Sequence, residues 1–232
     1  MDKAIKVNNL SKKYDNDIAI DKVSFDIEKG KVVGLLGPSG SGKSTIIRIL
    51  AGLVKADSGS FEIFNHNFNP KINNNVIYKV DDLVIEEKLG IMDFINLYDD
   101  FYKSFSPKNT LEILEYLNID HKTMVCGMSK GERQKFHLAM ALANDGDIYL
   151  LDEIFDGLDP ISTSKVMDLL IDRIDGEKTF ILASQQLKLV ENLLDEVIFL
   201  DNGKIHYKDS VLSIDEKEKV GISEFYDKIY LG

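Results

Sequence analysis

A stretch near the start of the chain carries the residue types and spacing of a phosphate-binding loop. It reads Gly37-Pro-Ser-Gly-Ser-Gly-Lys-Ser-Thr45 and fits the pattern G-x-x-x-x-G-K-[ST]. Glycines let the backbone turn tightly, so that several main-chain N–H groups point into one concavity and can cradle a polyphosphate. A lysine at this position reaches the β- and γ-phosphates, and the serine after it holds Mg²⁺. The stretch therefore predicts a nucleotide site that contains Lys43 and Ser44.

The elements on either side of this loop are those that the motif requires. Residues 31–36 form a short apolar run, typical of a buried strand, and apolar residues recur at helical spacing from Ser44 to Leu53. Strand, glycine-rich loop and helix is the order of a P-loop. The N-terminus of the helix also brings its positive dipole end to the bound anion.

Two carboxylates end a second apolar run. Residues 147–153 read Asp-Ile-Tyr-Leu-Leu-Asp-Glu, which places Asp152 and Glu153 at the C-terminal edge of a predicted buried parallel strand. Ligands bind at that edge in open α/β sheets. Asp152 suits a Walker B carboxylate that holds Mg²⁺ through its water shell, and Glu153 suits a group that polarises an attacking water.

Composition narrows the class of protein. The 232 residues are 44% hydrophobic, enough for the core of an α/β domain, and the formal net charge is −11. This charge argues against a nucleic-acid partner and against direct docking on anionic lipid. The sequence contains no apolar run of membrane-spanning length and no signal-peptide pattern. We expect a cytoplasmic protein that reaches a membrane only through partner chains.

The chain contains one cysteine, Cys126. A single cysteine allows neither a disulfide framework nor a cysteine-based metal site. We expect Cys126 to be a small residue that is buried or half-buried.

The remaining periodicity predicts a single α/β domain over residues 1–232. Alternation before the P-loop predicts an N-terminal antiparallel β subdomain, and helical spacing over about 84–143 predicts a helical insert subdomain. We predict a P-loop NTPase core with a mixed sheet. The other predicted strands are 4–10, 23–27, 60–64, 76–80, 179–183, 196–200 and 204–207, with an Asn-Gly hairpin turn before the last of them. The other predicted helices are 110–117, 129–143, 161–174, 187–194 and 222–231, and 65–75 is predicted to be a loop.

These pieces, in this order, resemble the nucleotide-binding domain of the ABC ATPases over essentially the whole chain. Met128-Ser-Lys-Gly-Glu132 is similar to the ABC signature Leu-Ser-Gly-Gly-Gln, and Gly157-Leu-Asp159 is similar to the D-loop. From the residues alone, Ser129 and Glu132 form a capping box that opens a helix. In the family, two domains sandwich ATP head to tail. The signature helix of one domain then meets the γ-phosphate held by the P-loop of the other.

The resemblance implies the ABC ATPase fold, ATP and Mg²⁺ as ligands, and ATP hydrolysis as the reaction. Tyr14 would stack on adenine, although from the residues alone it is as readily a core or surface aromatic. Ser44 and Asp152 would hold the metal. The residues implied to bind nucleotide are Tyr14, Ser39, Gly40, Ser41, Gly42, Lys43, Ser44, Thr45, Ser129, Gly131 and Glu132.

Two positions depart from the family pattern. Asp81-Asp82 stands where the Q-loop glutamine is expected, and Gln185 stands where the switch histidine contacts the γ-phosphate. A glutamine amide can donate a hydrogen bond but cannot carry a positive charge. We assign Glu153, Gln185 and Asp81 to the catalytic set. ATP binding is expected to be intact, with hydrolysis that is slow or depends on a partner's second site.

Within the family, the chain resembles the stand-alone ATPase subunits of bacterial ABC-2-type exporters, including those for antimicrobial-peptide, bacitracin and toxin-peptide export or immunity. The resemblance rests on the single short chain, the signature variant Ser129–Gln134 and the Tyr/Phe run Leu97–Phe105. It implies transmembrane permease subunits as partners, a homodimer or a heterodimer with a second ATPase, and a place at the inner face of the cell membrane. The helical insert and the Asp81-Asp82 loop would form the docking surface.

Two other functions remain open at this point. One is a catalytically weak ABC subunit that regulates a partner through its nucleotide state. The other is a non-transport ABC ATPase that acts on ribosomes or DNA, against which the acidic net charge argues.

Overall fold

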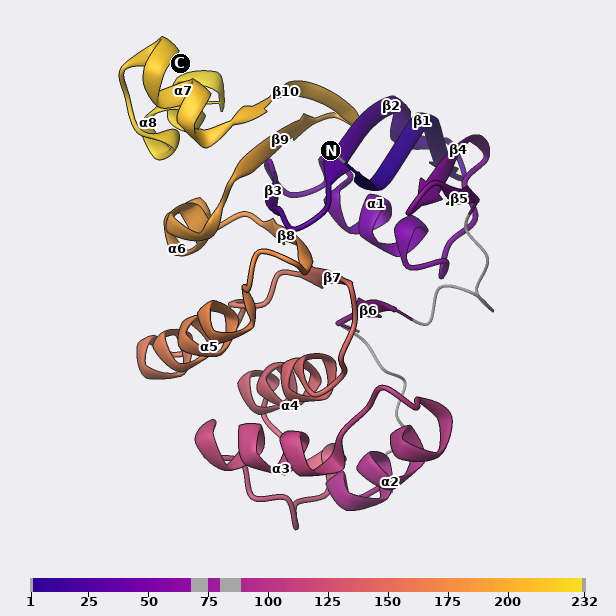
Figure 1. Ribbon diagram of the computed structural model, residues 1–232, viewed down its shortest axis with the longest axis vertical. Helices are drawn as coiled ribbons and strands as arrows, with labels where there is room; N and C mark the ends of the chain where they lie inside the picture. Colours follow the sequence, from indigo (N-terminus) through magenta and orange to yellow (C-terminus); the bar gives the residue numbers. More distant parts are fainter. Residues whose placement is uncertain (1, 68–74, 80–88, 231–232) are drawn as a thin grey trace.

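Two β-sheets form the centre of the computed structural model, which describes residues 2–67, 75–79 and 89–230 (Figure 1). The first sheet is antiparallel, in the order β2-β1-β4-β5. Its strands are β1 (Lys3–Tyr14), β2 (Asp17–Glu28), β4 (Ser58–Ile63) and β5 (His66–Asn67). The N-terminal antiparallel sheet is therefore confirmed, and its first two strands extend well beyond the predicted 4–10 and 23–27.

The second sheet is mixed and has the order β10-β9-β3-β8-β7-β6. All neighbouring strands from β9 to β6 in this order pair in parallel. Only β10 differs, because it pairs antiparallel to β9. The strands are β3 (Val32–Leu36), β6 (Val76–Tyr78), β7 (Ile148–Asp152), β8 (Thr179–Ser184), β9 (Glu196–Asp201) and β10 (Lys204–Ser210). Every residue of β3, β7 and β8 is buried, which is why these strands are continuous apolar runs.

The two faces of the mixed sheet bury different elements. Side chains alternate along a strand, so Val33 and Leu35 of β3 enter one core while Val32 and Leu36 enter the other. Helix α1 (Lys43–Leu50) and the antiparallel sheet cover the first face. Helices α4 (Lys130–Leu142) and α5 (Pro160–Arg173) cover the second. The mixed sheet thus places α1 and the helices around α4 on opposite faces.

A set of helices lies between β6 and β7 and forms the lower part of Figure 1. It comprises α2 (Ile91–Phe101), α3 (Pro107–Tyr116), a 3₁₀ turn (Val125–Gly127) and α4. Ser106 caps α3, because its side chain accepts a hydrogen bond from the main-chain N–H of Asn109 at 3.2 Å. The predicted helical insert is present; its first residues, 84–88, lie outside the described residues.

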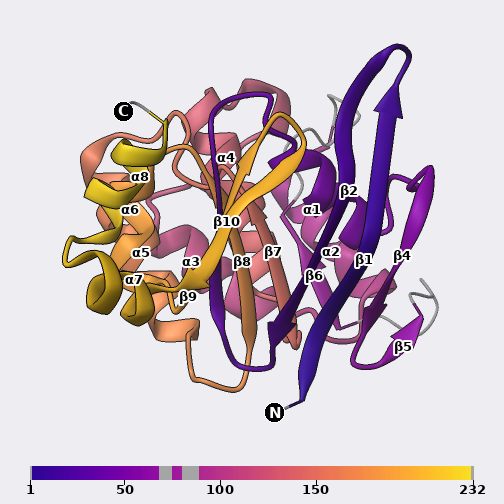
Figure 2. The same ribbon diagram turned by 90° about the horizontal axis from the view of Figure 1, so that it is seen from above.

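The C-terminal region packs on the edge of the mixed sheet. Helices α7 (Val211–Glu218) and α8 (Ile222–Tyr230) lie beside α6 (Leu187–Val190), on the side away from the β1–β2 hairpin (Figure 2). Tyr226 packs edge-on against Phe199 of β9, with ring centroids 5.5 Å apart. The predicted tail helix is thus present over the described residues. The sequence analysis missed α7, which buries only Ile214 and so has no clear apolar period.

Two predicted helix boundaries were wrong. The helix expected over 44–53 ends at Leu50, because Gly52 adopts the left-handed conformation (φ 76°) and turns the chain away. Leu53 is 61% exposed. The single helix expected over 187–194 is α6 followed by a 3₁₀ turn, Glu191–Leu193.

The expectation for Cys126 was also wrong, because its side chain is exposed. In the 3₁₀ turn that contains Cys126, only Val125 is buried, and Gly127 on the other side is exposed. The turn therefore lies at the surface and directs Val125, not Cys126, into the core. None of the helices in the described ranges combines the length and apolar character needed to cross a bilayer.

Tyr149 allows a test of how the core of this fold is held. Its side chain is fully buried, donates a hydrogen bond to Asn144 O at 2.7 Å and accepts one from Gly146 N at 3.2 Å. Tyr149→Phe removes both bonds and leaves main-chain groups unsatisfied, so we predict a loss of about 1–2 kcal/mol in unfolding free energy, measured by urea denaturation. Tyr116→Phe is the control, because the Tyr116 hydroxyl bonds Asp168 at the surface and its loss changes stability by at most about 0.5 kcal/mol. Equal losses in the two variants would contradict this assignment.

Candidate active site

Lys43 lies inside the P-loop, at the start of α1. Its ammonium group donates hydrogen bonds to Gly37 O at 2.8 Å and to Pro38 O at 3.0 Å, and the residue is 4% exposed. In this conformation the loop's own carbonyls hold the ammonium. A phosphate oxygen is a stronger, charged acceptor for the same group.

Glycine is required at two positions of the loop. Gly42 has φ 106°, and a Cβ there would lie 2.6 Å from Ala19 O on β2. Gly37 has φ 151°, and a Cβ there would lie 2.2 Å from Leu200 O on β9. The P-loop therefore lies in close contact with β2 of the antiparallel sheet and β9 of the mixed sheet. Glycine permits these contacts because it has no side chain.

The remaining loop residues fall into two groups. Ser39 and Gly40 are exposed at the crest of the loop, and Ser44 and Thr45 are half-buried in the first turn of α1. Ser41 differs from them, since its side chain is buried and its N–H donates to Pro38 O at 3.2 Å. In this conformation the Ser41 side chain is shielded from solvent.

The Lys43 ammonium lies within the electrostatic reach of the two carboxylates that end β7. Burial lowers the pKa of Lys43, and attraction from Glu153 and Asp152 opposes that shift. Strands β3, β8 and β7 pair in parallel, so the loop that holds the lysine and the two acidic residues lie at the same, C-terminal edge of the mixed sheet.

Glu153 has an unusual backbone conformation, and hydrogen bonds hold both of its main-chain polar groups. Its φ is 43°, in the left-handed region, which costs a non-glycine residue about 1 kcal/mol. Its N–H donates to Ala183 O at 2.9 Å. Its carbonyl accepts from Gln134 Nε2 at 2.5 Å. These contacts offset the conformational cost and fix where the carboxylate points.

Gln185 bonds directly to the Glu153 carboxylate. The main-chain N–H of Gln185 donates to Oε2 at 3.3 Å, and its side-chain Nε2 donates to Oε1 at 3.1 Å. The two residues that the sequence analysis assigned to catalysis are thus adjacent. Asp81, the third, lies outside the described residues.

Asp152 is fully buried at the last position of β7. Its main-chain oxygen accepts a hydrogen bond from Lys79 Nζ at 2.7 Å, and Lys79 is itself fully buried. The sequence analysis missed Lys79, although a lysine inside the apolar run 76–80 was a visible signal.

The oxygen ligands present fit Mg²⁺. A serine hydroxyl and a carboxylate are hard donors of the kind this ion prefers, and Mg²⁺ usually completes its shell with water and phosphate oxygens. Among the described residues there is no cluster of three or more His, Cys, Asp or Glu side chains that could hold a metal alone. A partial protein set of Ser44 and Asp152 is what a metal shared with a nucleotide requires.

Tyr14 ends β1 at the tip of the first hairpin and pairs with Asp17 of β2. Its ring is 43% exposed, and the Lys12 ammonium lies 5.4 Å from the ring centroid. Two residues beyond Asp17, Ala19 contacts the P-loop at Gly42. An exposed aromatic face near the P-loop can stack on a base.

The signature residues open α4 as a capping box. Ser129 N donates to the Glu132 carboxylate at 2.9 Å, and Glu132 N donates to Ser129 Oγ at 3.2 Å. The Glu132 carboxylate accepts hydrogen bonds from Ser129 N and, at 2.7 Å, from Ser129 Oγ, and these two bonds lower the pKa of Glu132. Ser129 is exposed, so its helix end faces solvent.

Gly131, next in the signature, packs against the D-loop-like turn of the same chain. A Cβ at Gly131 would lie 2.9 Å from Gly157 O. Nearby, Lys130 pairs with Asp156 at 2.6 Å. Asp159 ends this turn and caps α5, accepting from the main-chain N–H groups of Ile161 and Ser162. The signature and this turn thus form one surface, built from α4 and the segment after β7.

Comparison with known proteins gives the family. Residues 20–156 match the ABC transporter family. The chain is 32% identical over 215 residues to the bacitracin transport ATP-binding protein BcrA of Bacillus licheniformis, covering 88% of this chain and 69% of the relative. It is 28% identical to the Nod factor export ATP-binding protein I of Ralstonia nicotianae, covering 86% of this chain and 65% of the relative.

The fold agrees with this match. The dimeric structure of MJ0796, a bacterial ABC transporter cassette, aligns with 89% of this chain and 98% of that cassette, at 26% identity and a TM-score of 0.78. The predicted P-loop ABC fold is therefore confirmed. Together with the matched segment, which contains the P-loop and both carboxylates of β7, this shows that the chain belongs to the ABC transporter family as an ATP-binding subunit with ATPase activity.

Proposed function

We propose that this chain hydrolyses Mg-ATP to power an exporter whose transmembrane subunits are separate chains, and that it works at the inner face of the cell membrane. The observation that carries the ATPase assignment is the convergence of Lys43 with Asp152 and Glu153 at one sheet edge. The export direction is supported by a relative named for Nod factor export.

Each group of the site has a role in this proposal. Lys43 and the P-loop N–H groups bind phosphate, and Tyr14 stacks on adenine. Ser44 and Asp152 hold Mg²⁺, which when bound neutralises charge on the phosphates. Glu153 accepts a hydrogen bond from the attacking water and orients it.

A second copy, or a sister ATPase, completes the site. Ser129 is exposed at the N-terminus of α4, where the main-chain N–H groups and helix dipole favour a phosphate. Helix α1, which follows the P-loop of the same chain, packs on the face of the mixed sheet opposite to α4. We therefore assign Ser129, Gly131 and Glu132 to the nucleotide held by a partner's P-loop. The dimeric structure of the related cassette MJ0796 supports this arrangement.

Hydrolysis in this chain is proposed to be slow. Gln185 already donates to both oxygens of Glu153, so a water must share that carboxylate or displace the amide. An amide also brings no positive charge to the γ-phosphate, unlike a histidine. If turnover is very low, the chain acts instead as a nucleotide-gated regulatory subunit.

The docking surface for the transmembrane partner is proposed to include α2. Leu97 and Phe101 are 43% and 73% exposed and lie one helical turn apart, with Tyr102 (48% exposed) next to them. Large apolar side chains exposed together mark an interaction site. Asp81 and Asp82, the other part of the predicted docking surface, lie outside the described residues.

The role of Gln185 is tested by Gln185→His. Histidine restores a group that can carry charge next to the γ-phosphate, so we expect the turnover number for Mg-ATP to rise about tenfold with little change in nucleotide affinity. Turnover would be measured by phosphate release at saturating Mg-ATP, with Gln186→His as the neighbouring control. A Gln185→His protein that is no faster than the parent argues against this explanation of slow hydrolysis.

The docking proposal is tested by Phe101→Asp in cells that contain the native transmembrane subunits. The charge sits on an exposed face, so folding should change by at most about 0.5 kcal/mol. We expect the variant to move from the membrane fraction to the soluble fraction while retaining parental ATP binding. Glu115→Lys on α3 provides an exposed charge-changing control. Unchanged membrane association of Phe101→Asp would rule out docking through α2, and association with ribosomes would favour the non-transport alternative.

A further inference from the structure

Lys79 is a lysine in an unusual place. It follows β6 directly and has no solvent exposure, which puts it among the largest fully buried side chains of the described residues. Lysine is almost never fully buried unless its charge is compensated, because desolvating an ammonium group is costly. An apolar side chain of similar volume would serve core packing at a lower cost. The position therefore suggests a role that requires a charged donor.

Both ends of Lys79 contact β7. Its main-chain N–H donates to Leu150 O at 3.1 Å, continuing the parallel ladder in which Tyr78 pairs with Leu150. Its side chain extends along β7, and Nζ donates to the main-chain oxygen of Asp152 at 2.7 Å. The ammonium therefore lies at the peptide that joins Asp152 to Glu153.

That peptide is held at both of its polar atoms. Its oxygen accepts from Lys79 Nζ at 2.7 Å, and its N–H, which belongs to Glu153, donates to Ala183 O at 2.9 Å. A peptide group is planar, so fixing its oxygen and its hydrogen fixes the rotation of the whole unit. Because the side chains of Asp152 and Glu153 leave from the two Cα atoms of this unit, its rotation sets the direction of both carboxylates.

We propose that Lys79 is a positioning residue, which through its buried hydrogen bond to Asp152 O orients the Asp152 and Glu153 side chains for ATP hydrolysis. This inference rests on the proposed roles of those two residues. The bond is a charge-assisted one to a buried carbonyl, which is stronger than a bond between neutral groups. It opposes relaxation of Glu153 out of its left-handed conformation, φ 43°. Lys79 itself touches neither nucleotide nor water in this role.

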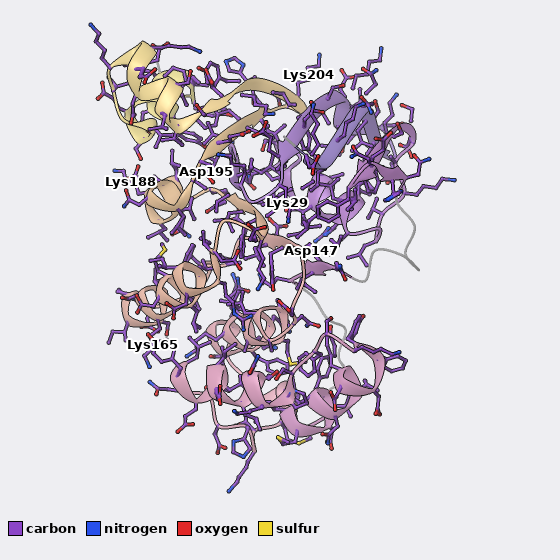
Figure 3. The ribbon with its side chains drawn as sticks, viewed as in Figure 1. Lys29, Asp147, Lys165, Lys188, Asp195 and Lys204 are labelled. Atoms are coloured by element: carbon purple, nitrogen blue, oxygen red, sulfur yellow. The ribbon has the colours of Figure 1, made fainter. Side chains whose placement is uncertain are left out.

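The test compares three variants of the full chain with the parent. Lys79→Met removes the charge and the donor while keeping a long unbranched side chain. Lys79→Arg keeps a charged donor in a bulkier side chain. Lys165→Met is the matched control, because Lys165 on α5 also donates to a main-chain oxygen, that of Tyr116 at 2.5 Å, and lies at the outer surface of the molecule (Figure 3).

The measurements distinguish a role of Lys79 in orienting the Asp152–Glu153 peptide from a role in core packing and from a role in ATP binding. Turnover number and KM for Mg-ATP are measured with Glu153→Gln as the blank, and ATP affinity is measured by equilibrium binding. Amide hydrogen exchange is followed in peptides that cover residues 148–156, where the Glu153 N–H reports directly on the peptide that Lys79 holds.

In Lys79→Met we expect turnover to fall about tenfold, ATP affinity to stay within about twofold, and exchange over residues 148–156 to accelerate about tenfold. Lys79→Arg should retain more turnover than Lys79→Met, and Lys165→Met should match the parent in every readout. If Lys79→Met does not fold, Lys79→Gln, whose amide is too short to reach Asp152 O, takes its place with the same expectations.

Two results would overturn the proposal. One is parental turnover together with parental exchange in Lys79→Met. The other is a larger loss in Lys79→Arg than in Lys79→Met, which indicates that only side-chain volume matters. If the parent hydrolyses ATP no faster than Glu153→Gln, the proposed role of Glu153 fails. The exchange measurement still decides whether Lys79 holds the peptide.

Discussion

The attraction between the buried Lys43 ammonium and the carboxylates of Asp152 and Glu153 depends on the whole architecture of the chain. The parallel strands β3 and β7 are both fully buried, and β8 between them fixes their spacing, so the loop after β3 and the acids after β7 meet at one edge. The antiparallel sheet packs on the P-loop at Gly42. The second core holds α4 and α5 in place behind the acids. A charged group buried among apolar strands is stable only with such partners nearby.

In the proposed mechanism, Gln185 in place of the switch histidine affects the rate of hydrolysis rather than the binding of phosphate. The proposed phosphate-binding groups of the P-loop, with Lys43 and Ser44 among them, fit the family pattern G-x-x-x-x-G-K-[ST]. The proposed water-handling groups are held by three hydrogen bonds: Gln185 donates to the Glu153 carboxylate, Gln134 to the Glu153 carbonyl, and Lys79 to the main-chain oxygen of Asp152. Replacing a histidine with a glutamine changes that water-handling set and leaves the phosphate cradle intact.

The sequence was sufficient for the order of strands and helices, the P-loop and the acids at the end of β7, because burial of parallel strands requires long apolar runs that are visible without a structure. It was not sufficient for contacts that depend on distant segments. No local pattern reveals that Gln185 reaches Glu153 or that Lys79 reaches Asp152 O. The end of α1 could not be predicted because it depends on the left-handed backbone of Gly52. Helix α7 could not be predicted because it buries a single residue, Ile214, and so has no apolar period. Cys126 was misjudged because the preference of cysteine for the interior is statistical, whereas its exposure is set by neighbouring residues.

The central claim is that a complete site needs the P-loop of one copy and the signature helix of another. The most direct measurement is the specific Mg-ATPase activity of the purified chain over a range of protein concentrations, with Glu153→Gln as the blank. Specific activity that rises with concentration, and is abolished in Glu153→Gln, is the predicted result for a homodimer with two composite sites. Glu153-dependent activity that stays constant down to concentrations at which the protein is monomeric would contradict the claim, because one copy would then hold a complete site.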